Sequence, residues 1–141
     1  MVVLDTDHLS ILEWAGTPEA LRLLERLSRL QPSNVVATII SFEEQTRGWL
    51  SVLAKARSMM QQIEAYRRLK RQLDNYRAIP VLGFDENAAA EFHRLERLHL
   101  RIGTLDLKIA STVLAQGATL LSRNLSDFKK VPGLQVEDWT R

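Results

Sequence analysis

The sequence predicts an α/β protein of three layers, in which a mainly parallel sheet of four to five strands lies between helices. Short apolar runs, typical of buried parallel strands, recur along the chain. Helical stretches separate these runs, and this alternation is typical of a parallel sheet with helices on both faces. The 141 residues contain no repeat, low-complexity tract or linker, so we expect one domain over residues 1–141.

Turn and capping residues mark the ends of the elements expected in the first half of the chain. Gly16 ends a first helix, and Thr17 followed by Pro18 begins a second one. Ser41 is expected to cap a third helix, with Glu44 in the capping-box position. The elements are a strand at residues 2–4, a helix at 7–14, a helix from residue 17 and a strand at 35–40.

A helical composition continues to Arg77, with a weak point near Gly48. One long helix and two antiparallel helices both fit this pattern. The next strand is expected at 79–82. Because Pro80 cannot donate a ladder hydrogen bond, it either begins this strand or places it at a sheet edge. The remaining expected elements are a helix from Asp85 to about residue 100, a helix from Thr104 to Gly117, a strand at 118–121 and a strand at 134–136.

Cysteine is absent from the chain, which excludes disulfides, thiolate zinc sites, iron–sulfur clusters and a cysteine nucleophile. This composition is compatible with a reducing cytosol. No apolar run approaches the ~18 residues that span a bilayer, and an aspartate at position 5 argues against a signal peptide. We therefore expect a cytoplasmic protein without membrane contact.

Acidic residues follow two of the expected strands. Asp5 comes directly after the strand at 2–4, and Glu43 and Glu44 follow the strand at 35–40. In an open α/β sheet, ligands bind beyond the carboxyl ends of the strands, so carboxylates at these positions are candidates for a metal site. Glu43 and Glu44 are equally well explained as acids in the first turn of a helix, where they complement its dipole.

Asp106 gives a sharper signal. It heads a helical stripe of Ile109, Ala110 and Val113 that should face the sheet, where an ionised carboxylate is costly unless it is paired or bound to metal. An exposed acid at the helix start is the alternative. Clustered carboxylates without His or Cys suit Mg²⁺ or Mn²⁺, and such an ion can activate water and stabilise charge on a phosphoryl oxygen.

Four segments resemble the motifs of PIN-domain ribonucleases, in order and at the expected spacing. The bacterial VapC toxins of type II toxin–antitoxin pairs are the nearest resemblance. The segments are VLDTDHLS at 3–10, ISFEEQTRG at 40–48, GTLDLKIA at 103–110 and ATLLSRNLSDF at 118–128. The resemblance covers nearly the whole chain and implies a PIN-like fold.

The resemblance also implies a Mg²⁺- or Mn²⁺-dependent endoribonuclease that acts as a toxin. Asp5 matches the first family acid and Asp106 the third. Glu44 rather than Glu43 matches the second, because it stands four residues before Gly48. These three acids would hold the ion while metal-activated water attacks an RNA phosphodiester in line. The implied partners are a VapB-like antitoxin and a second copy of the chain.

The fourth acidic position of the family falls on Asn124 in this sequence. Its amide oxygen can ligate a metal ion or its water but adds no negative charge, and Asp127, three residues on, is the substitute. Ser122 matches a hydroxyl position near the site. Asp7 stands where many relatives have Asn and is expected as a turn residue beside the site.

Basic residues gather between Arg47 and Arg77, where eight Lys and Arg against two acids give a local excess of +6. A solvated helix face is the alternative, but beside an acidic metal site we favour RNA steering. Expected RNA contacts are Arg47, Lys108 and Arg123, although a simple surface role suits Lys108 equally. An apolar stripe in the same region would be helix-pair core or a surface for a dimer or antitoxin. It comprises Met59, Met60, Ile63, Tyr66 and Leu69.

Other functions compete with this interpretation. A haloacid-dehalogenase-type phosphotransferase also begins with Asp-x-Asp after a first strand, but it needs Thr or Val where Leu9 stands. A response-regulator receiver needs an Asp at the end of its third strand, which residues 81–83 lack. The stronger alternative is a catalytically weak PIN-like module that binds RNA or protein. Asn124 favours this module, whereas the three retained acids oppose it.

Overall fold

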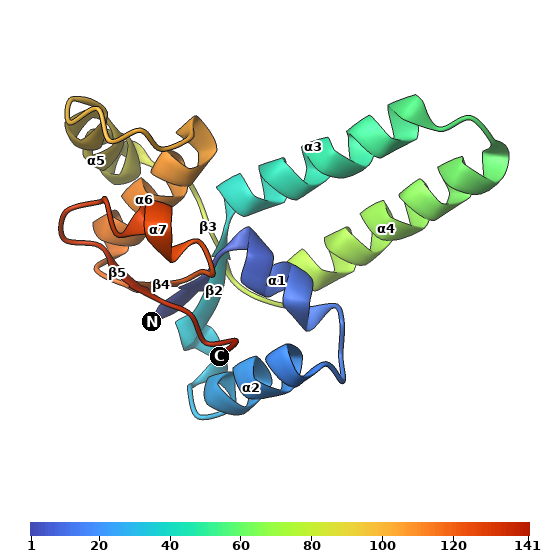
Figure 1. Ribbon diagram of the computed structural model, residues 1–141, viewed down its shortest axis with the longest axis horizontal. Helices are drawn as coiled ribbons and strands as arrows, with labels where there is room; N and C mark the ends of the chain where they lie inside the picture. Colours follow the sequence, from blue (N-terminus) through green and yellow to red (C-terminus); the bar gives the residue numbers. More distant parts are fainter.

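The computed structural model describes residues 1–141 as a three-layer α/β structure with a long helical hairpin at one side (Figure 1). The strands are β1 (Val2–Leu4), β2 (Val35–Thr38), β3 (Val81–Leu82), β4 (Thr119–Leu121) and β5 (Gln135–Glu137). The helices are α1 (Thr6–Leu12), α2 (Pro18–Leu27), α3 (Ile39–Lys55), α4 (Met59–Arg77), α5 (Glu86–Glu96), α6 (Thr104–Gln116) and α7 (Leu125–Phe128).

All five strands are parallel and lie in the order β3-β2-β1-β4-β5. This confirms the predicted sheet. β1 is central, and each of its residues is buried, as expected of a strand covered on both faces. Val3 pairs with Val36 of β2 and with Leu120 of β4, so the carboxyl ends of the three inner strands meet at one edge.

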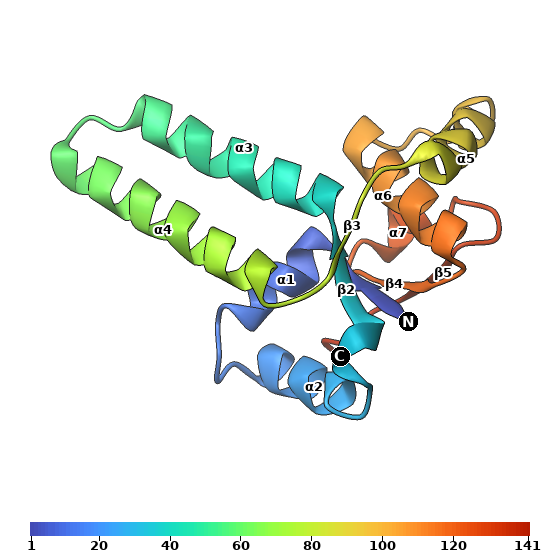
Figure 2. The ribbon, with the colours of Figure 1, turned by 180° about the vertical axis from the view of Figure 1, so that it is seen from behind.

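Successive residues of β1 point into two different apolar layers. Val3 joins the larger cluster, to which Ile109 of α6 belongs. Val2 and Leu4 join a smaller cluster with Leu23 of α2. Figures 1 and 2 accordingly show α5 and α6 on one side of the sheet and α1 and α2 on the other. The side-chain alternation of one short strand thus anchors both helical layers.

β2 is shorter than the sequence predicts, because Thr38 rather than Ser41 caps α3. The Thr38 hydroxyl accepts a hydrogen bond from the Ser41 backbone N–H at 3.1 Å. Ile39 and Ile40 therefore lie in the first turn of the helix and not in the strand. The predicted strand at 35–40, the Ser41 cap and the capping-box position of Glu44 are wrong for this reason.

α3 and α4 are two antiparallel helices that project from the body of the molecule (Figures 1 and 2). α3 continues through Gly48, and the break falls at residues 56–58. Near the base of the hairpin, Tyr76 of α4 packs edge-on against Phe42 of α3, with ring centroids 5.2 Å apart. Neither these helices nor any other combines the length and hydropathy that a bilayer-spanning segment requires.

Backbone conformation determines where α5 and α6 end. α5 ends at Glu96 rather than near residue 100, because His99 and Arg101 take left-handed conformations with φ of 50° and 57°. Gly117 ends α6 with φ of 61°, which confirms the predicted terminal glycine. Pro80 precedes β3 at the edge of the sheet, where its missing N–H costs no ladder hydrogen bond.

Candidate metal centre

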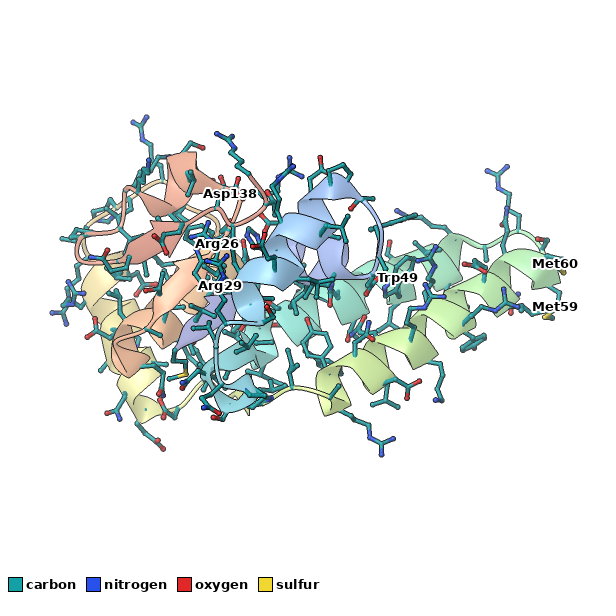
Figure 3. All side chains as sticks on the ribbon, turned by 90° about the horizontal axis from the view of Figure 1, so that it is seen from below. Arg26, Arg29, Trp49, Met59, Met60 and Asp138 are labelled. Atoms are coloured by element: carbon teal, nitrogen blue, oxygen red, sulfur yellow. The ribbon has the colours of Figure 1, made fainter.

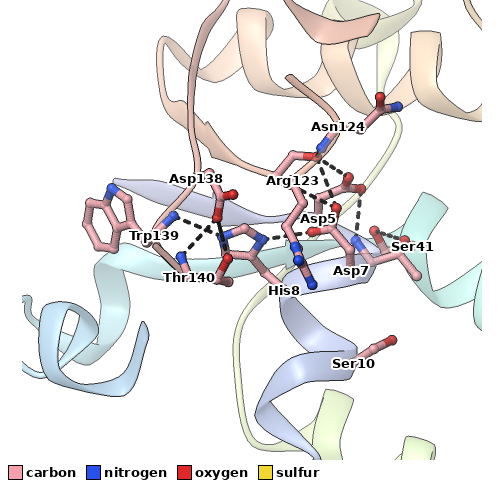
Figure 4. A network of polar contacts seen from close by, with 12 residues as sticks. Asp5, Asp7, His8, Ser10, Ser41, Arg123, Asn124, Asp138, Trp139 and Thr140 are labelled. Carbon is pink, nitrogen blue, oxygen red and sulfur yellow. Dashed lines mark hydrogen bonds and ion pairs between the residues drawn. The ribbon is translucent and has the colours of Figure 1, made fainter. Parts of the chain in front are cut away.

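Asp5 and Ser122 lie side by side just beyond the ends of β1 and β4. Leu4 pairs with Leu121, so extending the register by one residue places Asp5 opposite Ser122. The Asp5 N–H donates to the Leu121 carbonyl at 2.9 Å, and the Ser122 hydroxyl donates to Asp5 Oδ2 at 2.7 Å (Figure 4). The sheet itself therefore fixes the position of the first acid.

The carboxylate of Asp5 is buried without a cation. Its residue is 6% exposed, and no Lys, Arg or His side chain forms an ion pair with it. Burial and, to a smaller extent, the charges of Asp7 and Asp106 raise the pKa of Asp5 to about 7, although the hydrogen bonds from Ser122 and the Thr6 N–H act in the opposite direction. An unpaired buried acid of this kind marks a candidate functional site.

Asp106 occupies the first turn of α6, as the sequence predicts, and is half-buried. Burial raises the pKa of Asp106, and the charges of Glu44, Asp127 and Asp7 add to this effect. The raised pKa values show that acids from four separate parts of the chain act on one another. The structure thus brings the predicted acids into one field of negative charge.

Glu43 and Glu44 differ in their surroundings. Glu43 pairs with Arg47 on the same helix, with Oε2 and Nη2 2.6 Å apart. Glu44 has no ion-pair partner, and its charge raises the pKa of Asp106. This geometry favours Glu44 as the member of the acidic cluster, in line with the motif spacing.

The fourth position is shared by two side chains that contact each other. Asn124 donates from Nδ2 to Asp127 Oδ2 at 3.2 Å, and Lys130 donates to the other oxygen of Asp127 at 3.1 Å. These two hydrogen bonds lower the pKa of Asp127. Asp127 therefore has a cation beside it, unlike Asp5, Glu44 and Asp106.

The donor set fits a hard divalent ion that retains part of its water shell. As placed, no group of three His, Asp or Glu side chains is arranged to hold a metal ion. Mg²⁺ usually binds through one or two carboxylates and keeps several waters, so it does not require such a group. All the candidate ligands, Asp5, Glu44, Asp106, Asn124 and Asp127, offer oxygen, and a cation here would remove the mutual repulsion that raises the pKa values of Asp5 and Asp106.

Polar residues beside Asp5 form a wider network than the sequence indicates. The Thr6 hydroxyl donates to Ser41 Oγ at 3.1 Å, which ties α1 to the start of α3. Asp7 accepts from the Arg123 backbone N–H at 2.9 Å, but it belongs to the first turn of α1 and is not the turn residue that the sequence predicts. His8 is fully buried and hydrogen-bonded at both ring nitrogens (Figure 4). No sequence spacing signals these long-range pairs.

The three residues expected to contact RNA have different surroundings. Arg47 is held in its ion pair with Glu43. Lys108 follows Asp106 by two residues in the chain, and its ammonium lies 5.9 Å from the ring centroid of Phe84. Arg123 is exposed and directly follows Ser122. Lys108 and Arg123 are thus the basic residues that the chain places next to the acids.

Comparisons with known proteins agree with this geometry. The family model of the PIN domain matches residues 2–134. Ribonuclease VapC2 of Rickettsia felis is 45% identical over 47 residues, or 33% of this chain and 35% of that protein. The tRNA(fMet)-specific endonuclease VapC of Salmonella typhimurium is 31% identical over 65 residues, or 43% of this chain and 49% of that protein. The chain thus matches between a third and a half of the length of these curated relatives.

Similarity to solved structures extends over the whole chain. VapBC-1 from nontypeable Haemophilus influenzae is 26% identical, with a TM-score of 0.70 and 100% of both chains covered. DNA-bound VapBC from Salmonella typhimurium is 22% identical, with a TM-score of 0.73, 98% of this chain and 97% of that chain covered. The fold implied by the four sequence motifs is confirmed.

Replacing Asp5 by Asn should stabilise the metal-free protein at alkaline pH. The pKa of Asp5 rises from its ordinary value of 3.8 to about 7 in the folded protein, so the folded state holds this proton more tightly than the unfolded state. Stability is therefore lost as pH rises through that interval. We expect the variant to be more stable by up to about 4 kcal/mol near pH 8 and equal to the wild type below about pH 4.

Urea denaturation with a chelator present, repeated across this pH range, measures the difference. A variant that is less stable than the wild type near pH 8, or a difference that does not change with pH, would contradict an uncompensated carboxylate at position 5.

Proposed function

The chain belongs to the PIN domain family, and from this we propose that residues 1–141 act as a single-domain, metal-dependent endoribonuclease, the toxin of a type II toxin–antitoxin pair. The observation that carries the proposal is the set of acids without cation partners, Asp5, Glu44 and Asp106, at the carboxyl edge of the sheet. The names of the two curated relatives, a ribonuclease and a tRNA endonuclease, support RNA as the substrate.

Each proposed ligand is positioned by a different element. Asp5 is held by the hydroxyl of Ser122 and by the Thr6 N–H. Asp106 extends from the first turn of α6, and Glu44 lies one turn into α3. Asn124 or Asp127 would complete the set. Bound Mg²⁺ or Mn²⁺ would supply Lewis acidity and an activated water for hydrolysis of the phosphodiester.

Basic residues near this edge suit an RNA backbone. Arg123 and Lys108 adjoin the acidic residues in the chain and are the proposed phosphate contacts. The excess of basic residues from Arg47 to Arg77 would raise the local concentration of RNA through long-range attraction. Since RNA is the proposed substrate, we place the activity in the cytoplasm.

The hairpin is the proposed surface for protein partners. Met59 and Met60 lie at its tip, 67% and 73% exposed (Figure 3), and Ile63 and Tyr66 follow on α4, 42% and 57% exposed. The stripe predicted from the sequence is thus largely solvent-exposed rather than helix-pair core. Exposed apolar side chains in such number mark an interaction surface. A VapB-like antitoxin and a second copy of the chain are the proposed partners, supported by the VapBC complexes of the same fold.

Glu43 and Glu44 provide a matched pair for testing the active site. Glu44→Gln should lower the Mn²⁺-dependent cleavage of single-stranded RNA by a factor of about 100 or more, because it removes a preorganised charge next to the reaction. Glu43→Gln removes only an ion pair on the helix surface and should retain activity. The measurement is initial cleavage rate with RNA and DNA oligonucleotides in parallel.

Two outcomes would contradict this assignment. Equal losses in both variants would show that Glu44 has no special place in the site. RNA binding without cleavage under any divalent ion would favour the binding module over the nuclease, and cleavage of DNA alone would change the substrate class.

Partner binding can be tested on the apolar stripe. Ile63→Asp should lower the affinity for the antitoxin encoded beside the toxin gene at least about tenfold, because it places a charge where an apolar contact is desolvated. Leu21→Asp, at a 56% exposed position on α2, is the control and should bind as the wild type does. Calorimetry measures both affinities. Unchanged binding by Ile63→Asp would exclude the stripe as the antitoxin surface.

A further inference from the structure

His8 links two segments of the chain that lie far apart in the sequence. Its ring is 0% exposed, in the first turns of α1. One ring nitrogen, Nδ1, lies 2.7 Å from Asp7 Oδ1, and the other, Nε2, lies 3.2 Å from the backbone nitrogen of Trp139 (Figure 4). Both nitrogens of a fully buried imidazole are therefore in use.

The partners of His8 determine where its proton is. A carboxylate can only accept a hydrogen bond, and a backbone N–H can only donate one. His8 must therefore donate from Nδ1 to Asp7 and accept at Nε2 from Trp139. These hydrogen bonds place a proton on Nδ1 and hold the ring between Asp7 and the C-terminal segment, in which Asp138 Oδ1 also lies 3.7 Å from Nε2.

The C-terminal segment gives this arrangement a firm base. Asp138 accepts from the Thr140 N–H at 2.9 Å and from its hydroxyl at 2.6 Å, which closes a tight turn. From α2, Arg22 donates to the Thr140 carbonyl at 2.7 Å, and the Arg26 guanidinium lies 4.3 Å from the centroid of the Trp139 ring. The Trp139 N–H, which donates to His8, thus belongs to a segment that contacts with α2 hold in place.

On its other side, His8 acts on the loop between β4 and α7 through Asp7. The second oxygen of Asp7 accepts from the Arg123 backbone N–H at 2.9 Å. In the same loop, Ser122 accepts from the Asn124 N–H at 3.0 Å while it donates to Asp5 at 2.7 Å. The hydrogen bonds therefore run from Trp139 through His8 and Asp7 into the loop that contains Ser122, the residue that donates to Asp5, and Asn124.

We propose that His8 is a positioning residue for the metal centre: the Trp139 N–H keeps the ring proton on Nδ1, and the Nδ1–H holds Asp7 where it accepts from the Arg123 N–H of the β4–α7 loop. This inference rests on the proposed function, since its purpose is to hold Ser122 and Asn124 in place around Asp5. Groups that orient ligands from outside a metal site typically change metal affinity about 10- to 100-fold when they are lost.

Two substitutions test separately the two hydrogen bonds of His8, to Asp7 and from Trp139. In His8→Asn, the amide nitrogen can replace Nδ1 and donate to Asp7, but the contact with Trp139 is lost. In His8→Gln, the longer side chain can place its carbonyl oxygen at the Nε2 position and accept from Trp139, but Asp7 loses its donor. Both variants replace the buried ring by a smaller amide, so thermal unfolding is measured on both to compare their losses in stability.

The readout is Mn²⁺ affinity, measured by electron paramagnetic resonance of the free ion, together with hydrogen exchange of the Arg123 amide in the metal-free protein. We expect His8→Gln to bind Mn²⁺ about 10- to 100-fold more weakly than the wild type and to exchange the Arg123 amide faster. His8→Asn should keep the wild-type affinity and the wild-type protection at Arg123.

The same loss in both variants, or no loss in either, would overturn the positioning role and leave His8 as a packing residue. If the wild type itself binds no Mn²⁺, the proposed nuclease function fails. The exchange of the Arg123 amide still decides whether His8 controls the loop, so the two failures are distinguishable.

Discussion

The main constraint on this structure is that it holds several carboxylates near one another without a basic side chain to neutralise them. Asp5 lies between β1 and α1, Glu44 lies in α3 and Asp106 lies in α6, and none of the three has an ion-pair partner. Burial and the charges of neighbouring acids raise the pKa values of Asp5 and Asp106, so the ionised forms of these two residues oppose folding at neutral pH. The parallel sheet keeps them in place, because its inner strands end at one edge. A binding site of this kind is maintained at a cost in stability.

Much of the fold follows from local sequence. Three apolar residues before Asp5, the cap at Asp85 and the glycine at 117 each act through their own neighbours, so the sequence predicts them. The sequence predicts the end of β2 wrongly because Thr38 and Ile39 suit a strand as well as a helix start. Only the hydrogen bond from the Ser41 N–H to the Thr38 hydroxyl shows that the helix begins here. The early end of α5 depends on left-handed conformations that its residues do not signal.

The candidate site likewise contains some residues that the sequence predicts and some contacts that it does not. Asp5 and Asp106 were predicted because they stand at a strand end and at a helix start, positions that leave a pattern in the sequence. Glu44 was distinguished from Glu43 only by its spacing to Gly48 in the family motif. His8 and the C-terminal segment were not predicted as parts of one network, since residues 8 and 139 meet only in the folded chain. The acids that would bind the ion are thus visible in the sequence, and the contacts that orient them are visible only in the structure.

The most direct test of the central claim is a crystal structure of the protein soaked in Mn²⁺, with an anomalous difference map collected near the manganese absorption edge. We expect a peak within bonding distance of carboxylate oxygens of Asp5 and Asp106. A map without a peak between these two residues, at a concentration that supports RNA cleavage, would contradict the account.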